Sequence, residues 1–113
     1  MTAEQYLKRP YDLKKKAKTY RYIADCYQKR EDEQNRQKFL EMAQVLEKEA
    51  DEKSVRIMRL LRRVHPLYAD ALKYRYLLGL TLDEVAGSLN YTKRHTTRLI
   101  QKGLAQVEDI YVG

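Results

Sequence analysis

Apolar residues recur every three or four positions through most of the chain. The first series stands four, three, four and three residues apart, at Leu13, Ala17, Tyr20, Ala24 and Tyr27. A second series with related spacing comprises Phe39, Ala43, Leu46, Ala50, Ile57, Leu61 and Val64. Such heptad-like spacing keeps one apolar stripe on one side of a helix. The pattern therefore predicts two long helices.

No apolar residue lies between the two series, in the stretch QKREDEQNRQK of residues 28–38. We expect helices over about 12–30 and about 34–64 that fold back on each other, because an antiparallel hairpin buries both stripes. Pro10 is expected to separate a short opening segment, Thr2–Leu7, from the first long helix, with Asp12 as its N-cap. The alternative is one continuous helix that dimerises along the same stripe.

The second half of the chain contains stronger signals for the starts and ends of helices. His65-Pro66 should end the second long helix, because the residue before proline disfavours the helical region and proline suits a first helical turn. The stretch LYADALKYRYLLG then reads as a helix of about 12 residues that Gly79 stops at its C′ position. Thr81 and Glu84 form the capping-box pattern at the start of the next helix.

Two short helices are predicted after Thr81, with Asn90-Tyr91 as their connection. Leu82, Val85, Ala86 and Leu89 form the apolar face of the first. Thr92 should cap the second, whose inward positions would be Thr96, Leu99, Gly103 or Leu104, and Val107. Asparagine tolerates the left-handed conformation that a tight turn needs. Two short helices joined in this way form a helix-turn-helix, with the small Ala86 at the crossing.

The chain is therefore expected to be all-α, a long N-terminal helical hairpin followed by a three-helix, helix-turn-helix unit. Only four glycines and two prolines occur among 113 residues, as suits a helical protein. The expected division is residues 1–64 for the hairpin, as an oligomerisation segment, and 66–113 for a DNA-binding domain. A homodimer through the N-terminal helices is expected, since the stripe and the ten tyrosines offer surplus apolar surface. Tyr20, Tyr22 and Tyr27 are expected in the hairpin core; the alternative is that they stack on bases, as in proteins that bind single strands.

Charge separates the two halves of the chain. The net charge is +7, and residues 54–113 carry ten basic and five acidic residues. No acid occurs from Thr92 to Leu104. An excess of positive charge in one segment suits a polyanionic partner such as double-stranded DNA.

The predicted DNA-binding residues lie on the outward face or in the first turns of the last helix. Arginine can bond two acceptors of guanine at once, and lysine or threonine can meet base edges or phosphates. The N-terminal part of the second helix enters the major groove in this motif. The residues assigned to DNA are Thr92, Lys93, Arg94, His95, Thr97, Arg98, Gln101 and Lys102.

Other classes of function have little support in the sequence. No nucleophile has a base partner and no paired carboxylates occupy a plausible cleft, so an enzyme is not expected. Cys26, His65 and His95 are far apart, and neither a metal site nor a cofactor is expected. No apolar run of membrane-spanning or signal length occurs, so no membrane association and a cytoplasmic location are expected.

The stretch LKYRYLLGLTLDEVAGSLNYTKRHTTRLIQKGLAQV, residues 72–107, resembles region 4 of the sigma-70 family. The arrangement of the whole chain is similar to that of short phage-encoded transcription regulators of Gram-positive hosts, the ArpU- and RinA-like late activators. The resemblance implies a phage or prophage transcription regulator rather than a complete sigma factor. It also places Lys93, Arg94, Thr97 and Arg98 on base- and phosphate-contacting positions.

One alternative function stays open from the sequence. The region-4-like unit could dock on RNA polymerase or a sigma factor without reading DNA itself. In that case the chain is a protein-interaction module and the basic helix is incidental.

Overall fold

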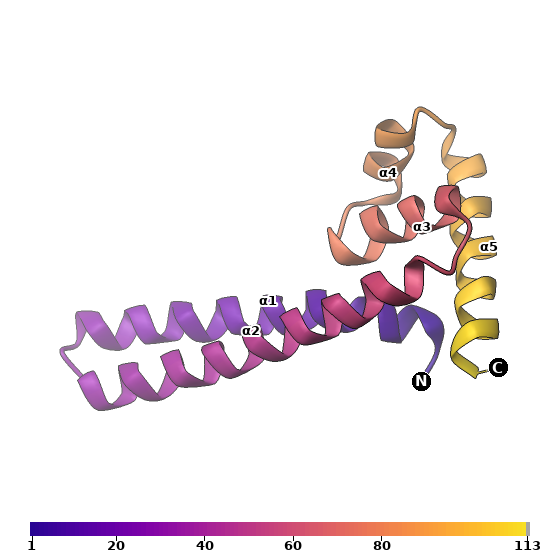
Figure 1. The fold of residues 1–113 in the computed structure, drawn as a ribbon. Helices are drawn as coiled ribbons and strands as arrows, with labels where there is room; N and C mark the ends of the chain where they lie inside the picture. The colour runs from indigo at the N-terminus through magenta and orange to yellow at the C-terminus, as the bar shows by residue number, and fades with distance from the viewer. Residues whose placement is uncertain (113) are drawn as a thin grey trace.

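The computed structural model describes residues 1–112, and within that range it contains five α-helices, one short π-helix and no strand. The elements are α1 (Ala3–Lys29), α2 (Glu33–Leu61), α3 (Pro66–Leu72), the π-helix η1 (Lys73–Leu77), α4 (Leu82–Leu89) and α5 (Lys93–Val112). Figure 1 shows α1 and α2 as a long arm, with the shorter elements gathered at one end of it. The molecule is correspondingly elongated, 52 × 31 × 19 Å. The all-α class is confirmed.

The arm is an antiparallel hairpin of α1 and α2 that turns at residues 30–32. Glu31 adopts the left-handed conformation with φ 58°, and Asp32 caps α2 by accepting the Asn35 N–H at 3.2 Å. Polar residues suffice for this turn because it lies at the tip of the arm and needs no core. The predicted hairpin is confirmed, and the single continuous helix is wrong.

Alanine dominates the buried seam of the arm. Ala17, Ala24, Ala43 and Ala50 are each at most 1 % exposed. Such small side chains let two helices approach closely, and seven-residue spacing keeps them in register along the seam. Both apolar stripes are buried within one chain, so they are not free to contact a second copy. A homodimer through these helices stays a prediction, and it would need to form through other residues.

The aromatic residues near the tip divide between the seam and the surface. The rings of Tyr20 and Tyr27 lie 6.0 and 5.6 Å from the ring of Phe39. Tyr22, by contrast, is 70 % exposed, so its prediction as a core residue is wrong. It falls two positions from Tyr20, on the opposite side of a helix whose buried stripe is only one alanine wide.

Pro10 does not interrupt the first helix. Helix α1 begins at Ala3, after a capping box of Thr2 and Gln5, and passes through Pro10 without a break. The predicted opening segment and the Asp12 cap are therefore wrong. An internal proline costs about 3 kcal/mol through its lost N–H and its ring clash. Here Pro10 is itself buried, and Leu7 beside it is only 1 % exposed.

Contacts from the end of the chain hold this first segment of α1 in place. The Ala3 N–H donates to the Glu108 side chain at 2.9 Å, and the rings of Tyr6 and Tyr111 lie 4.9 Å apart. A carboxylate at a helix N-terminus also interacts favourably with the helix dipole. The cost of the proline is thus offset by tertiary contacts that no local pattern reveals.

A single core joins the arm to the shorter helices. Leu7 of α1, Ile57 and Leu61 of α2, Leu72 of α3 and Val107 of α5 belong to one cluster, and each is at most 2 % exposed. The chain division at residue 65 stays a prediction, and apolar packing crosses it.

The α2–α3 corner and the end of η1 are pinned by polar groups. The His65 N–H donates to the Gln106 side chain of α5 at 2.9 Å, and His65 Nδ1 accepts the Leu67 N–H at 3.2 Å. Arg75 donates to the Leu80 carbonyl at 2.7 Å beyond the end of η1. Gly79 has φ +69°, which confirms its predicted stop position. The π-helical turn itself was not predicted from the sequence.

The two helical glycines should respond oppositely to alanine. A Cβ on Gly103 would lie 2.9 Å from Cδ1 of the buried Leu72, whereas a Cβ on Gly87 would meet nothing within 4 Å. Gly103→Ala should lower the free energy of unfolding by about 1–3 kcal/mol through overpacking. Gly87→Ala should raise it by about 0.5–1 kcal/mol through helix propensity. Thermal unfolding followed by circular dichroism measures both, and a stabilised Gly103→Ala would contradict the close crossing.

Candidate nucleic-acid interface

The candidate interface begins at a tight corner between α4 and α5. The Thr81 hydroxyl accepts the Glu84 N–H at 3.2 Å, and the Glu84 carboxylate accepts the Thr81 N–H at 3.0 Å. The backbone and side-chain hydrogen bonds from Thr81 lower the pKa of the Glu84 carboxyl. Helix α4 ends at Asn90, which adopts the left-handed conformation with φ 59° and ψ 39°. The predicted capping box and left-handed turn residue are both confirmed.

Helix α5 starts immediately after this turn. The Thr92 hydroxyl accepts the His95 N–H at 3.1 Å, as expected for an N-cap. The ring of Tyr91 lies edge-on to that of His95, with centroids 4.5 Å apart. Tyr91, a large residue for a tight turn, therefore packs against the first turn of α5.

Apolar packing sets the angle between the two helices. Val85 and Ala86 of α4 are 0 % and 6 % exposed, and Leu99 of α5 is 4 % exposed. Thr96 is fully buried among them, where an aliphatic residue would be expected. Its hydroxyl donates to the Thr92 carbonyl at 2.9 Å, so no buried polar atom is left unpaired there.

The structure also shows which of the later residues of α5 face inward. Gly103 is buried and Leu104 is half-buried, so Gly103 takes the more central position. Val107 is fully buried. The buried stripe of α5 thus runs through Thr96, Leu99, Gly103 and Val107, and the opposite side of the helix is left to solvent.

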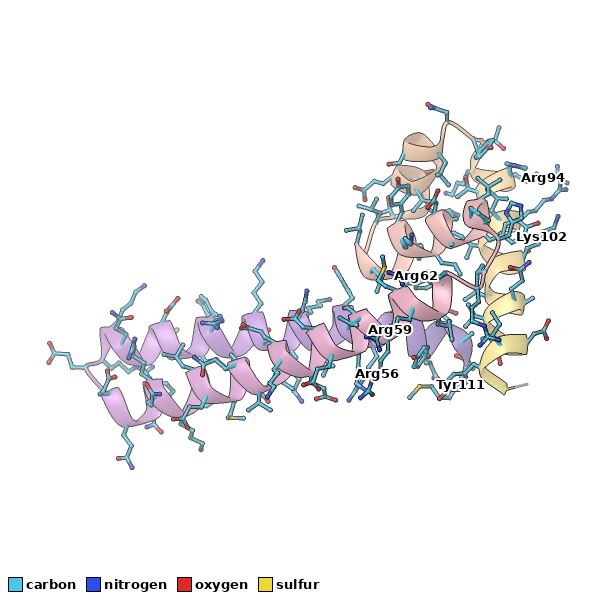
Figure 2. The ribbon with its side chains drawn as sticks, viewed as in Figure 1. Arg56, Arg59, Arg62, Arg94, Lys102 and Tyr111 are labelled. Atoms are coloured by element: carbon cyan, nitrogen blue, oxygen red, sulfur yellow. The ribbon has the colours of Figure 1, made fainter. Side chains whose placement is uncertain are left out.

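All but one of the predicted DNA-binding side chains are exposed to solvent at this end of α5. The exposed ones are Thr92, Lys93, Arg94, His95, Arg98, Gln101 and Lys102. Thr97 is half-buried, and its hydroxyl donates to the Lys93 carbonyl at 3.0 Å. Figure 2 shows Arg94 and Lys102 on the side of α5 that faces away from the other helices. The structure thus places the eight residues within three turns of one helix.

Positive charge on this face is almost uncompensated. Lys93 lies 3.6 Å from the Asp83 carboxylate of α4, and both side chains are well exposed. Arg94, Arg98 and Lys102 form no ion pair within residues 1–112. Exposed pairs are worth little in water, so even Lys93 can exchange its partner for a phosphate.

A second group of cations was missed from the sequence. Arg56, Arg59, Arg62 and Arg63 are exposed at the end of α2, and none makes an ion pair in the described part of the chain. The available signal was the run from Ser54 to Ala69, which contains no acid.

Asn90 offers a test of the corner. An L-residue without a polar side chain is disfavoured in the left-handed region by about 1–2 kcal/mol. Asn90→Ala should therefore lower the free energy of unfolding, whereas Asn90→Gly should leave it unchanged or raise it slightly. Chemical denaturation of the three proteins measures the difference. Equal stability of the alanine and glycine variants would show that the corner does not depend on this conformation.

No protein-family model, curated protein or solved structure matches the chain. No helix in residues 1–112 is long and apolar enough to cross a membrane. Within the same residues, no cluster of histidine, cysteine and carboxylate side chains could hold a metal ion. The function of this protein is therefore inferred from the geometry and charge of its own residues.

Proposed function

We propose that the protein binds double-stranded DNA sequence-specifically, with α4 and α5 as a helix-turn-helix and α5 as the recognition helix. The observation that carries the proposal is the solvent-facing side of α5 around Arg94 and Arg98, which is cationic and lacks any acid. Phosphate charge dominates the affinity of proteins for DNA, and an acid at this position would repel it.

The start of α5 suits a phosphate. The first N–H groups of a helix have no partner within the helix, and the helix dipole places positive potential there. At α5 the His95 N–H is taken by Thr92. The N–H groups of Lys93 and Arg94 remain to meet an anion beside the lysine ammonium.

The side chains further along α5 suit base edges. Arg94, Arg98 and Lys102 are spaced four residues apart, which places them in one slanting row along the helix. Arginine can make a bidentate contact to guanine, and Gln101 can do so to adenine. The hydroxyl of Thr97 is occupied by the backbone, so its methyl group is the part offered to a thymine methyl.

A role as a phage or prophage transcription regulator is part of this proposal. It rests on the resemblance of residues 72–107 to sigma-70 region 4, together with a basic helix that follows a tight corner. DNA binding by α5 could bring the chain to a promoter, while the hairpin arm projects to one side of it (Figure 1).

Loss of either arginine should weaken binding to the preferred site. The site is first selected from random duplexes. Arg94→Ala and Arg98→Ala should each cost about 1–3 kcal/mol of binding free energy if the side chain reads a base. Gel-shift titration at fixed salt measures the change. Lys29→Ala at the far end of α1 removes one exposed positive charge as a control and should bind like the wild type.

The base-reading role would be refuted if both arginine variants kept wild-type affinity for the selected site. Uniform weakening on every duplex would instead assign those arginines to phosphates. If the wild-type protein bound no duplex at low salt, DNA binding would be refuted altogether.

A second candidate function is binding to a partner protein such as RNA polymerase, and one observation favours it. A hollow of about 740 Å³ lies between α1 and the end of η1, on the side of the C-terminal helices away from α5. Leu78 and Tyr22 line it and are 59 % and 70 % exposed, and no acid is among its lining residues. Lys15 and Lys18 stand beside these apolar groups. This chemistry fits an acidic amphipathic helix of a partner.

Charge reversal in this hollow separates the two functions. Lys15→Glu/Lys18→Glu should abolish capture of purified bacterial RNA polymerase by the immobilised protein, because an acidic partner helix would be repelled. DNA affinity should change much less than in Arg94→Ala, since the hollow lies on another side of the molecule. Unchanged polymerase capture by the double variant would exclude the hollow as the docking site.

A further inference from the structure

Four arginines follow one another closely at the end of α2, two in its last turns and two just beyond its last residue, Leu61. Arg56, Arg59, Arg62 and Arg63 are all exposed, and we refer to them as the arginine surface. Figure 2 shows Arg56, Arg59 and Arg62 along the end of α2 that meets the C-terminal helices. Their guanidinium groups are available to solvent ligands, because none is ion-paired within residues 1–112.

The four arginines contribute little to the stability of the free protein. One or two cations near a helix C-terminus are favoured by the helix dipole. Like charges three residues apart, however, destabilise a helix, and Arg59 has Arg56 three residues before it and the C-cap Arg62 three residues after it. The nearest acid before the cluster, Glu52, makes no ion pair in the described structure. A bound polyanion would relieve this repulsion.

The residues that follow the arginine surface are linked to α5 by a hydrogen bond. The His65 N–H, two residues beyond Arg63, donates to the Gln106 side chain at 2.9 Å. Gln106 lies one turn after Lys102 on α5. The two contributing segments, residues 54–69 and 85–107, contain no acid. Positive side chains therefore extend from the start of α5 to the end of α2 without an intervening carboxylate from either segment.

One acid from a neighbouring element does approach the cluster. Asp70 of α3 shares a shallow hollow with Arg62, and its carboxylate lies 3.9 Å from the Lys73 ammonium. Lys73 offsets that charge locally. Arg56, Arg59 and Arg63 do not line this hollow.

We propose that the arginine surface binds the phosphate backbone of the same duplex that α5 reads, on one flank of the recognised site. This inference rests on the proposed function of α5. Twelve residues separate Arg94 from Gln106, which corresponds to about 18 Å along a helix. Phosphates on one strand are about 3.4 Å apart, so a separation of this size requires a flank of several base pairs beyond the contacts of Arg94.

Phosphate binding rather than base reading follows from the placement of the four arginines. They spread around the side of a helix end, whereas base edges are reached by side chains of an element that enters a groove. Contacts of this kind position a protein on the duplex without reading its sequence. The affinity should therefore depend on the length of one flank and be insensitive to its base composition.

The test compares two charge-matched variants on duplexes of different flank length. The first is Arg56→Gln/Arg59→Gln/Arg62→Gln/Arg63→Gln, and the control is Lys16→Gln/Lys29→Gln/Lys38→Gln/Lys48→Gln. All eight residues are exposed and outside the ion pairs of the described structure. Glutamine retains helix propensity, and circular dichroism checks that each variant is folded.

On a long duplex the arginine variant should bind at least about tenfold more weakly than the wild type at moderate salt. The slope of log affinity against log salt should fall in magnitude by about 2–4, or about 1 for each lost phosphate contact. Removing one flank of the duplex should weaken the wild type similarly and affect the variant little. The lysine control should retain most of the affinity and the full dependence on that flank.

Two results would overturn the inference and leave the proposed function intact. One is wild-type affinity and salt slope in the arginine variant, with Arg94→Ala still impaired. The other, which needs no variant to fold, is wild-type binding that is unchanged when either flank is removed. Absence of duplex binding by the wild type would reject the proposed function and this inference together.

Discussion

The close crossing of α3 and α5 at Gly103 determines which side of α5 is left to solvent. Leu72 and Tyr68 of α3 occupy the space where a side chain at residue 103 would be. Core packing is dense and strongly resists added volume, so this contact fixes α5 both in distance and in rotation about its axis. With Thr96, Leu99 and Val107 facing inward, the row of cations on the other side of the helix is turned outward as a consequence.

Charge is distributed along α5 in keeping with this orientation. All charged residues in its first three turns are basic. Its acids come in the last two turns, where Glu108 accepts the Ala3 N–H of α1. Glu108 thus serves the fold. The arginine surface at the end of α2 follows the same logic, because the nearest acids lie in the preceding turn of α2 or beside Lys73. The segments that carry the two groups of cations are linked through the His65–Gln106 hydrogen bond.

Local signals in the sequence were sufficient for most of the elements and for the recognition helix. The three-to-four residue period of the apolar positions predicted the hairpin, since a stripe of that period has to be buried. Thr81 with Glu84, Gly79 and Asn90 predicted the ends of helices, because capping bonds and positive φ involve only neighbours in the chain. The outward cations of α5 were predicted for the same reason: once the inward stripe is known, the remaining face of a helix follows.

Contacts between distant residues decided the rest. Pro10 stays inside α1 because Glu108, 105 residues beyond Ala3, and the shared core hold that segment helical. The π-helical turn of η1 packs against α1, a distant part of the chain, and no periodicity encodes that contact. The sequence by itself determined which residues form helices and which faces carry charge, since both depend on spacing within one element. Only the tertiary structure brought the arginines of α2 beside α5, because that juxtaposition depends on the angle at which the arm meets the C-terminal core.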